Sequence, residues 1–292
     1  MQLTPEQVKG RIKNLAKVKN ADARVLMRMY MMERFLERVA NSEYKNNFII
    51  KGGMLVTAMV GMALRSTMDI DTSIRNQNLS AADSKHIIED ITAVDLGDGV
   101  RFEIKDISDI MDEMEYPGIR VTLNAVMDRL ITPMKIDIST GDAVTPRAIE
   151  YDYRLMFDDR SIKLWSYNLE TILAEKLQTI LARSVLNTRM RDFYDVYILL
   201  SLYENKIDGT VFREAFDATC QKRGTLKLTQ NAPAIISNIN EDDTMHKLWA
   251  AYQKKYTYAE KIQLRVVRAD RFATLLSEGL GEVVCPYGWI AI

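Results

Sequence analysis

The pattern of apolar and polar positions predicts helices at both ends of the chain and a run of strands between them. Near the N-terminus, Thr4-Pro5-Glu6-Gln7 has the composition of a helix capping box, with threonine as the N-cap and proline at the first helical position. Apolar residues then recur at helical spacing. We therefore expect one helix that ends at about Lys17 and a second over residues 21–40.

Short apolar runs bounded by glycine and proline follow, and they predict strands. The expected strands are residues 47–51, 68–75, 101–111, 119–127 and 134–140. Two helices interrupt them, one over 54–64 and one that runs from a Ser80 cap to about Thr92. Strands with two intervening helices indicate an α+β core of about 100 residues.

After about residue 152 the pattern becomes helical. Two short extended pieces, 153–157 and 162–165, precede helices expected over 169–184, 190–203, 209–221, 245–255 and 258–277. We predict three parts, namely N-terminal helices (1–45), an α+β core (46–150) and a mostly helical C-terminal domain (151–292). The final residues, VVCPYGWIAI, are expected to dock on the body of the protein.

Composition narrows the class of protein. The chain has 292 residues and a net charge of −1, so nucleic-acid binding would require a local basic patch. Two cysteines and two histidines exclude a disulfide scaffold and a four-thiolate zinc site, and they argue against a histidine-rich metal site. The N-terminus has no apolar signal core, and the longest apolar run, 54–64, is too short to cross a bilayer. We expect a cytoplasmic protein without membrane partners.

Asp69 and Asp71 are the first candidates for chemistry. They lie two residues apart in an expected strand, so their carboxylates should share a face and repel each other. A divalent metal that carries a phosphate is the usual way to bring two such groups together. Solvated carboxylates at a strand end are the simpler explanation, and neighbouring residues must decide between the two.

Two flanking features favour a phosphate site. Gly52 and Gly53 end a strand just before a helix, where the backbone can approach a phosphate and free N–H groups are available. Arg65, Ser66 and Thr67 directly precede the acidic strand and offer a cation and hydroxyls. The alternatives are a tight turn and an ordinary loop at a helix C-terminus.

Asp137 is the third acidic candidate. It lies on the polar side of the strand 134–140, opposite an apolar face. If this strand lies beside that of Asp69, three carboxylates converge as two-metal phosphoryl-transfer sites require, and Asp137 could also help to deprotonate an acceptor hydroxyl. The alternative is a strand residue that faces solvent.

The helical half contributes a lysine and an aspartate. Lys176 interrupts the apolar stripe of the helix 169–184, so it either reaches solvent along the helix surface or points at an anion such as a triphosphate. Asp192 begins the next helix and could lie near Lys176. The alternative is a set of capping charges with a surface pair between Arg191 and Asp195.

A basic stripe is expected further on. Lys254, Tyr258, Lys261, Arg265 and Arg268 would share one side of a helix. Basic side chains with an aromatic ring suit an RNA backbone, although such a stripe is more often a solvated helix face.

Taken in order, these motifs resemble the AbiE-type nucleotidyltransferase toxins. These are the toxic partners of type IV toxin–antitoxin and abortive phage infection systems, within the DNA polymerase β-like nucleotidyltransferase superfamily. The resemblance covers about residues 48–200 and is carried by the segments FIIKGG, RSTMDID, KIDIS, AEKLQTILAR and RMRDFYDVYIL.

The resemblance implies an α+β nucleotidyltransferase fold, with a mixed β-sheet core, flanking helices and a helical C-terminal part. It implies Mg²⁺ as the cofactor and a nucleoside triphosphate (NTP) as cosubstrate. The implied metal ligands are Asp69, Asp71 and Asp137. The implied triphosphate contacts are Gly52, Gly53, Arg65, Thr67 and Lys176. Asp192 matches an aspartate of the last motif, with Asp195 as an alternative.

The implied activity is transfer of a nucleotide to an acceptor, for which RNA and in particular a tRNA 3′ end is one candidate. A cognate antitoxin encoded nearby is the implied protein partner. Two alternatives stay open: a small-molecule adenylyltransferase of the antibiotic-modifying kind, and a non-catalytic protein that only binds nucleotide. The resemblance also implies a cleft with Asp69, Asp71 and Asp137 on one wall and Lys176 and Asp192 on the other.

Overall fold

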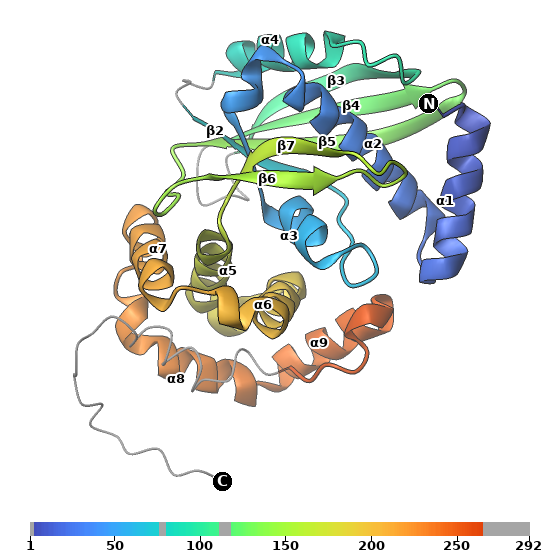
Figure 1. Ribbon diagram of the computed structural model, residues 1–292. Coiled ribbons are helices and arrows are strands. Elements are labelled where there is room, and N and C mark those ends of the chain that lie inside the picture. The colour runs from blue at the N-terminus through green and yellow to red at the C-terminus, as the bar shows by residue number, and fades with distance from the viewer. Residues whose placement is uncertain (1–2, 76–79, 111–117, 265–292) are drawn as a thin grey trace. The chain divides into compact units, whose positions relative to one another are not determined.

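The chain folds into two compact units, Met1–Asn168 and Leu169–Ile292. The computed structural model in Figure 1 describes residues 3–75, 80–110 and 118–264 of them. The first unit contains a β-sheet with its helices, and the described part of the second is helical. Two strands, over 149–154 and 161–166, pair within the sheet of the first unit. The division into three parts at residues 45 and 150 stays a prediction.

The first unit is built on a seven-stranded mixed sheet with the order β3-β4-β5-β2-β1-β7-β6. The strands are β1 (Phe48–Lys51), β2 (Ile70–Ile74), β3 (Val100–Ile110), β4 (Gly118–Met127), β5 (Leu130–Thr140), β6 (Ile149–Arg154) and β7 (Ser161–Ser166). β2 runs parallel to β5, and β1 runs parallel to β7, while the other neighbours are antiparallel. The expected α+β class with a mixed sheet is confirmed.

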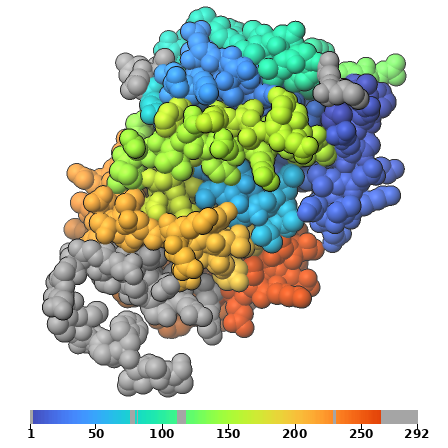
Figure 2. Space-filling model, viewed as in Figure 1, coloured from blue at the N-terminus to red at the C-terminus, as the bar shows by residue number. Residues whose placement is uncertain are grey.

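Helices cover this sheet. They are α1 (Pro5–Lys19), α2 (Ala23–Ala40), the 3₁₀ turn η1 (Glu43–Asn46), α3 (Gly52–Val60) and α4 (Ala81–Ala93). The capping box at Thr4 and Gln7 is formed, and α2 packs against α1, β5 and β7. Figure 2 shows α4 in teal and the β6–β7 strands in yellow-green on the surface of this unit, beside the blue N-terminal helices.

Several elements differ from the sequence-based expectation, among them β6, which covers Ile149–Arg154 where an extended piece was expected over 153–157. α3 ends at Val60 because Gly61 adopts a positive φ of 89°, so the helix is shorter than predicted. β2 begins at Ile70, which places Asp69 just before the strand. β5 begins at Leu130, ahead of Pro133, which is tolerated because β2 pairs with β5 only from Ile136 onward.

In its described part, the second unit contains four of the five helices that the periodicity predicted and one that it did not. The helices are α5 (Leu169–Arg183), α6 (Met190–Tyr203), α7 (Gly209–Lys222), α8 (Leu228–Glu241) and α9 (Asp243–Lys255), with 3₁₀ turns η2 (Ser184–Leu186), η3 (Glu204–Lys206) and η4 (Thr257–Ala259). α5 packs against α6, α7 and α8. The unpredicted helix is α8, which contains Pro233.

The expected helix over 258–277 is wrong over its described part. Residues 257–259 form a 3₁₀ turn, and no helix follows up to residue 264, where the description ends. Lys254, Tyr258 and Lys261 therefore do not share one helix face. Arg265 and Arg268, like the docked segment VVCPYGWIAI, lie outside the described residues. In the part of the chain that the structure describes, no helix is long and apolar enough to cross a membrane.

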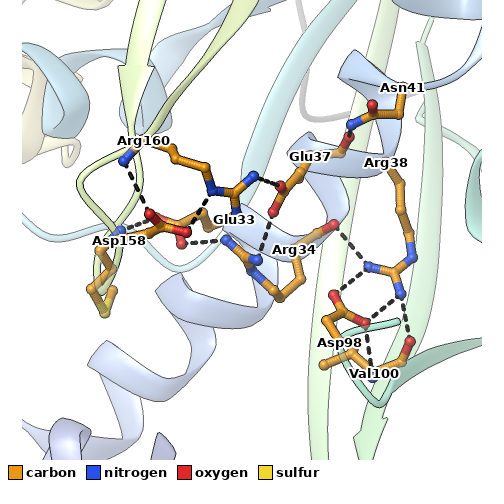
Figure 3. Close-up of polar contacts among 10 residues, drawn as sticks. Glu33, Arg34, Glu37, Arg38, Asn41, Asp98, Val100, Asp158 and Arg160 are labelled. Carbon is orange, nitrogen blue, oxygen red and sulfur yellow. Dashed lines mark hydrogen bonds and ion pairs between the residues drawn. The ribbon is translucent and has the colours of Figure 1, made fainter. Parts of the chain in front are cut away.

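An unusually charged helix lies in the core of the first unit. Glu33, Arg34 and Glu37 of α2 are buried, and Arg34 makes ion pairs to Glu33 (2.8 Å) and Glu37 (2.6 Å). Arg160 pairs with Glu37 (3.1 Å) (Figure 3). The Met156 N–H donates to Glu33 (2.6 Å). These contacts tie α2 to the β6–β7 connection.

The same helix reaches the sheet at its other end. Arg38 pairs with Asp98 (2.8 Å) and donates to the Val100 carbonyl (2.6 Å), at the start of β3 (Figure 3). Buried charges are tolerated only when they are paired and hydrogen-bonded. The network therefore fixes the position of α2 on the sheet.

We expect the stability of the protein to fall between about pH 4.5 and pH 7 because of Glu33. Burial raises the pKa of Glu33 to about 7, against the attraction of Arg34. In this window the folded state binds a proton that the unfolded state has lost, so the free energy of unfolding decreases as pH rises, by about 3 kcal/mol in total. Urea unfolding at a series of pH values measures it.

Glu33→Gln should remove this decrease, because glutamine does not titrate. The exposed Glu43→Gln is the matched control and should retain the wild-type pH profile. An unchanged slope in Glu33→Gln would show that other groups cause the pH dependence.

Candidate active site

A row of four charged residues crosses the centre of the sheet. Directly paired residues on neighbouring strands share a face. Lys51 on β1 pairs with Asp71 on β2, Asp71 pairs with Asp137 on β5, and Asp137 pairs with Arg120 on β4. The charges follow the order positive, negative, negative, positive. The parallel pairing of β2 and β5 thus brings Asp71 and Asp137 together, as the sequence predicted, and adds a cation at each end that it did not predict.

The glycine turn lies against this row. Gly52 has a positive φ of 58°, and a Cβ atom there would lie 2.2 Å from the Asp71 Oδ2 atom. The Gly53 N–H at the start of α3 donates to that same oxygen (3.1 Å). The turn thus holds the Asp71 carboxylate at the positive end of the α3 dipole. Of the two glycine N–H groups, it is the Gly53 N–H that donates to Asp71.

Arg65 and Thr67 lie on the other side of the turn. A Cβ atom at Gly53 would be 2.8 Å from the Thr67 hydroxyl and 2.9 Å from an Arg65 guanidinium nitrogen. Arg65 is 1% exposed and donates to the Ser66 carbonyl. Close packing therefore disfavours a side chain at either glycine, and four of the five residues expected to contact a triphosphate form one cluster in the first unit.

The acids of the row influence each other. Asp71 is partly accessible but densely surrounded by protein, and this loss of water raises the pKa of its carboxyl. The negative charges of Asp137 and Asp69 raise that pKa further, while the Gly53 N–H and Lys51 lower it. Like-charged carboxylates that perturb each other in this way are the electrostatic environment that a divalent cation stabilises.

Asp137 is already engaged by a protein cation. Arg120 Nε lies 2.8 Å from Asp137 Oδ1, and Arg120 Nη2 lies 2.9 Å from Oδ2, which is a bidentate fork. Within residues 3–75, 80–110 and 118–264, no group of three or more His, Cys, Asp or Glu side chains is arranged to hold a metal ion. The fit to a metal therefore rests on Asp69 and Asp71, and Asp137 as a third ligand stays a prediction.

Lys51 belongs to a second buried group on β1. Its ammonium lies 2.6 Å from Asp142 and 2.7 Å from the Ser139 hydroxyl, and the Tyr167 hydroxyl donates to Asp142 (2.6 Å). Burial acts to raise the pKa of Asp142, but Lys51 and the hydroxyl donors outweigh it and hold that pKa below its usual value. The position of Lys51 directly before the glycine pair was the one sequence signal for this group.

Lys176 and Asp192 meet in the second unit. Lys176 on α5 makes ion pairs to Asp192 (2.9 Å) and Asp195 (2.7 Å) on α6, and Arg189 lies 3.2 Å from the other oxygen of Asp192. The lysine therefore points at anions rather than reaching solvent. The expected pair between Arg191 and Asp195 does not form, because Asp195 is turned into the interior and is fully buried. Arg191 instead donates to the Tyr256 hydroxyl (3.1 Å).

The candidate residues thus lie in two clusters, one in each unit. The sheet of the first unit gathers Asp69, Asp71 and Asp137 with the glycine turn. The helices of the second unit gather Lys176 and Asp192. A cleft that brings the two clusters together stays a prediction.

Comparison with known proteins identifies the family. Residues 34–278 match the family described as the nucleotidyl transferase AbiEii toxin of type IV toxin–antitoxin systems. The chain belongs to the AbiEii family. The match includes every candidate residue of both clusters, and it makes the protein a transferase. No curated protein matches the sequence.

Solved structures show where the fold recurs. A candidate nucleotidyltransferase from H. pylori is 14% identical, with a TM-score of 0.51 over 87% of this chain and 93% of that one. The antibiotic-resistance factor ANT(2'')-Ia is 12% identical, with a TM-score of 0.42 over 71% of this chain and 99% of that one. At such identity, the first of these likenesses supports the AbiEii chain's nucleotidyltransferase fold and nothing finer.

We expect Gly52→Ala to lower the free energy of unfolding by more than the cost of placing alanine in the left-handed backbone conformation of Gly52. A left-handed backbone costs a residue other than glycine about 1–2 kcal/mol, and the clash with Asp71 should add about 1–3 kcal/mol. Gly97→Ala is the matched control, because Gly97 has a similar φ of 62° and nothing lies within 4 Å of its Cβ position. Urea unfolding compares the two, and equal losses would show that the contact with Asp71 is unimportant.

We expect Lys176→Met to cost about 3–5 kcal/mol of unfolding free energy, because it leaves two buried carboxylates without their main cation. Adding Asp192→Asn and Asp195→Asn to the same chain should recover most of the loss. The measurement is again urea unfolding of full-length variants. A small loss in Lys176→Met, with no recovery in the triple variant, would mean that the pair does not stabilise this unit.

Proposed function

We propose that this AbiEii-family chain is a Mg²⁺-dependent nucleotidyltransferase toxin that transfers a nucleotide from an NTP to an RNA acceptor, with a tRNA 3′ end as the leading candidate. The family supports a nucleotide substrate and a cognate antitoxin partner. A role in abortive phage infection is part of the same proposal.

One observation carries the proposed metal site. In the part of the chain that the structure describes, Asp137 and Asp142 each have a cationic partner, whereas Asp69 and Asp71 make no ion pair. Asp71 lies at the positive end of α3, and the negative charges of Asp137 and Asp69 both act on it. Asp69 and Asp71 would hold the ion, which when bound neutralises phosphate charge and activates the attacking hydroxyl.

The triphosphate would bind beside these acids. Arg65 and Thr67 are packed against Gly53, and Arg65 supplies a permanent positive charge in a buried position, where charge-assisted hydrogen bonds to phosphate are strong. Lys176 is the proposed cation from the second unit. Because Lys176 is already paired with Asp192 and Asp195, we propose that it would share its charge with the phosphates and remain positioned by the two aspartates.

An aromatic and basic cluster in the second unit supports RNA as the acceptor. The ring of Tyr256 lies 5.8 Å from the guanidinium carbon of Arg191, 5.3 Å from the Lys255 ammonium and 5.3 Å from the stacked ring of Tyr258. Burial acts to raise the pKa of Tyr256, but Arg191 and Lys255 outweigh it and lower that pKa. Aromatic rings among cations are the usual surface for single-stranded nucleic acid.

The test is transfer of labelled nucleotide from each of the four NTPs onto total RNA, in the presence of Mg²⁺. We expect label on RNA, and a loss of at least about 100-fold in Asp69→Asn and Asp71→Asn, because each removes a proposed metal ligand. Asp106→Asn is the matched control, an exposed strand aspartate outside both clusters, and should retain full activity.

The same assay separates the alternatives. Transfer to an amino-alcohol substrate with no label on RNA would identify a small-molecule adenylyltransferase. Binding of NTP without transfer to any acceptor would identify a non-catalytic nucleotide-binding protein. Undiminished transfer in both aspartate variants would contradict the assigned residues.

A further inference from the structure

We propose that Arg120 is a positioning residue that withholds Asp137 from the metal site, so that Asp69 and Asp71 alone supply its carboxylates. This inference rests on the proposed function, because it concerns the same site. It replaces the expectation of three converging acids with a pair of acids and a neighbouring ion pair. The residues that carry it all lie in the first unit.

The geometry of the Arg120–Asp137 pair is the first argument. Both carboxylate oxygens of Asp137 accept hydrogen bonds from Arg120, at 2.8 Å and 2.9 Å. Asp137 is 7% exposed, so few positions remain from which another cation could approach it. A bidentate arginine–carboxylate pair fixes the orientation of both partners. A metal ion could bind Asp137 only by displacing the guanidinium.

The register of the sheet is the second argument. Arg120 lies directly opposite Asp137, within ten paired positions of the β4–β5 hairpin. The fork therefore joins two paired strands and does not depend on a loop. The side chain of Arg120 is 28% exposed, so most of its surface is covered by protein.

The other end of the row is arranged in the same way. Lys51 is opposite Asp71, but its ammonium is directed to Asp142 and Ser139. Each flanking cation thus has its own aspartate, Arg120 with Asp137 and Lys51 with Asp142. Asp69 and Asp71 are left as two negative charges, and one divalent ion matches them.

The decisive experiment removes the Arg120–Asp137 pair as a unit. The double variant Arg120→Gln/Asp137→Asn removes one positive and one negative charge, so it tests ligation by Asp137 without changing the summed charge of the site. Mn²⁺ affinity of the full chain, without NTP, is measured by electron paramagnetic resonance. We expect the double variant to bind Mn²⁺ within about threefold of wild type, because no ligand has been lost.

The single variant Arg120→Gln should bind Mn²⁺ about tenfold more tightly than wild type, because it releases Asp137 as an additional ligand. Arg120→Lys retains the positive charge but cannot form the bidentate contact. Its Mn²⁺ affinity should lie between those of wild type and Arg120→Gln. Circular dichroism and thermal melting confirm that each variant is folded, and Arg120→Lys keeps the test available if Arg120→Gln does not fold.

The outcomes separate this inference from the proposed function. Mn²⁺ binding that weakens tenfold or more in the double variant would show that Asp137 is a ligand despite Arg120, and would overturn the inference alone. Mn²⁺ binding that is absent in wild type, or unchanged in Asp69→Asn and Asp71→Asn, would overturn the proposed metal site itself.

Discussion

The parallel pairing of β2 with β5 is the constraint on which the site depends. It places Asp71 next to Asp137 in a sheet whose other face is apolar and buried. Two neighbouring carboxylates in such a position are unfavourable unless cations compensate them. The structure compensates one of them with Arg120 and places the α3 N-terminus and the remote charge of Lys51 near the other. The negative charge that remains uncompensated is the basis of the proposed metal site.

Short secondary-structure elements make this compensation possible. α3 begins directly at Gly52, so the helix dipole and the Gly53 N–H reach Asp71 without an intervening loop. A side chain at either glycine would push away Asp71 on one side or Arg65 and Thr67 on the other. The absence of side chains at Gly52 and Gly53 thus leaves space for Asp71, Arg65 and Thr67. The Gly53 N–H also donates a hydrogen bond to the Asp71 carboxylate.

Much of the fold could be predicted from the sequence because the signals are local. Caps, helical periodicity and glycine turns gave most elements, and the lysine in an apolar stripe correctly indicated that Lys176 meets Asp192. α8 was missed because Pro233 and its several asparagines are poor helix signals, and packing against α5 compensates for them. The prediction that Tyr258 and Lys261 share one helix was wrong, because residue spacing alone cannot show where a helix ends.

The missed site residues depend on pairing between distant segments. Arg120 faces Asp137 because β4 and β5 are joined by the two residues Asp128 and Arg129, and each partner lies seven residues from that turn. The short turn was the available signal, but the expected strand began after Pro133 and concealed it. Asp142 and Tyr167 meet Lys51 only through strand order, which no local pattern encodes.

The β4–β5 hairpin therefore restricts how the length of this chain can change. Side chains alternate between the two faces of a strand, so one residue inserted between Arg120 and the turn would send the guanidinium to the apolar face or force a bulge. Two inserted residues would restore the face but move the guanidinium away from Asp137 by one repeat of the strand. This stretch must therefore keep its length even where its individual side chains vary.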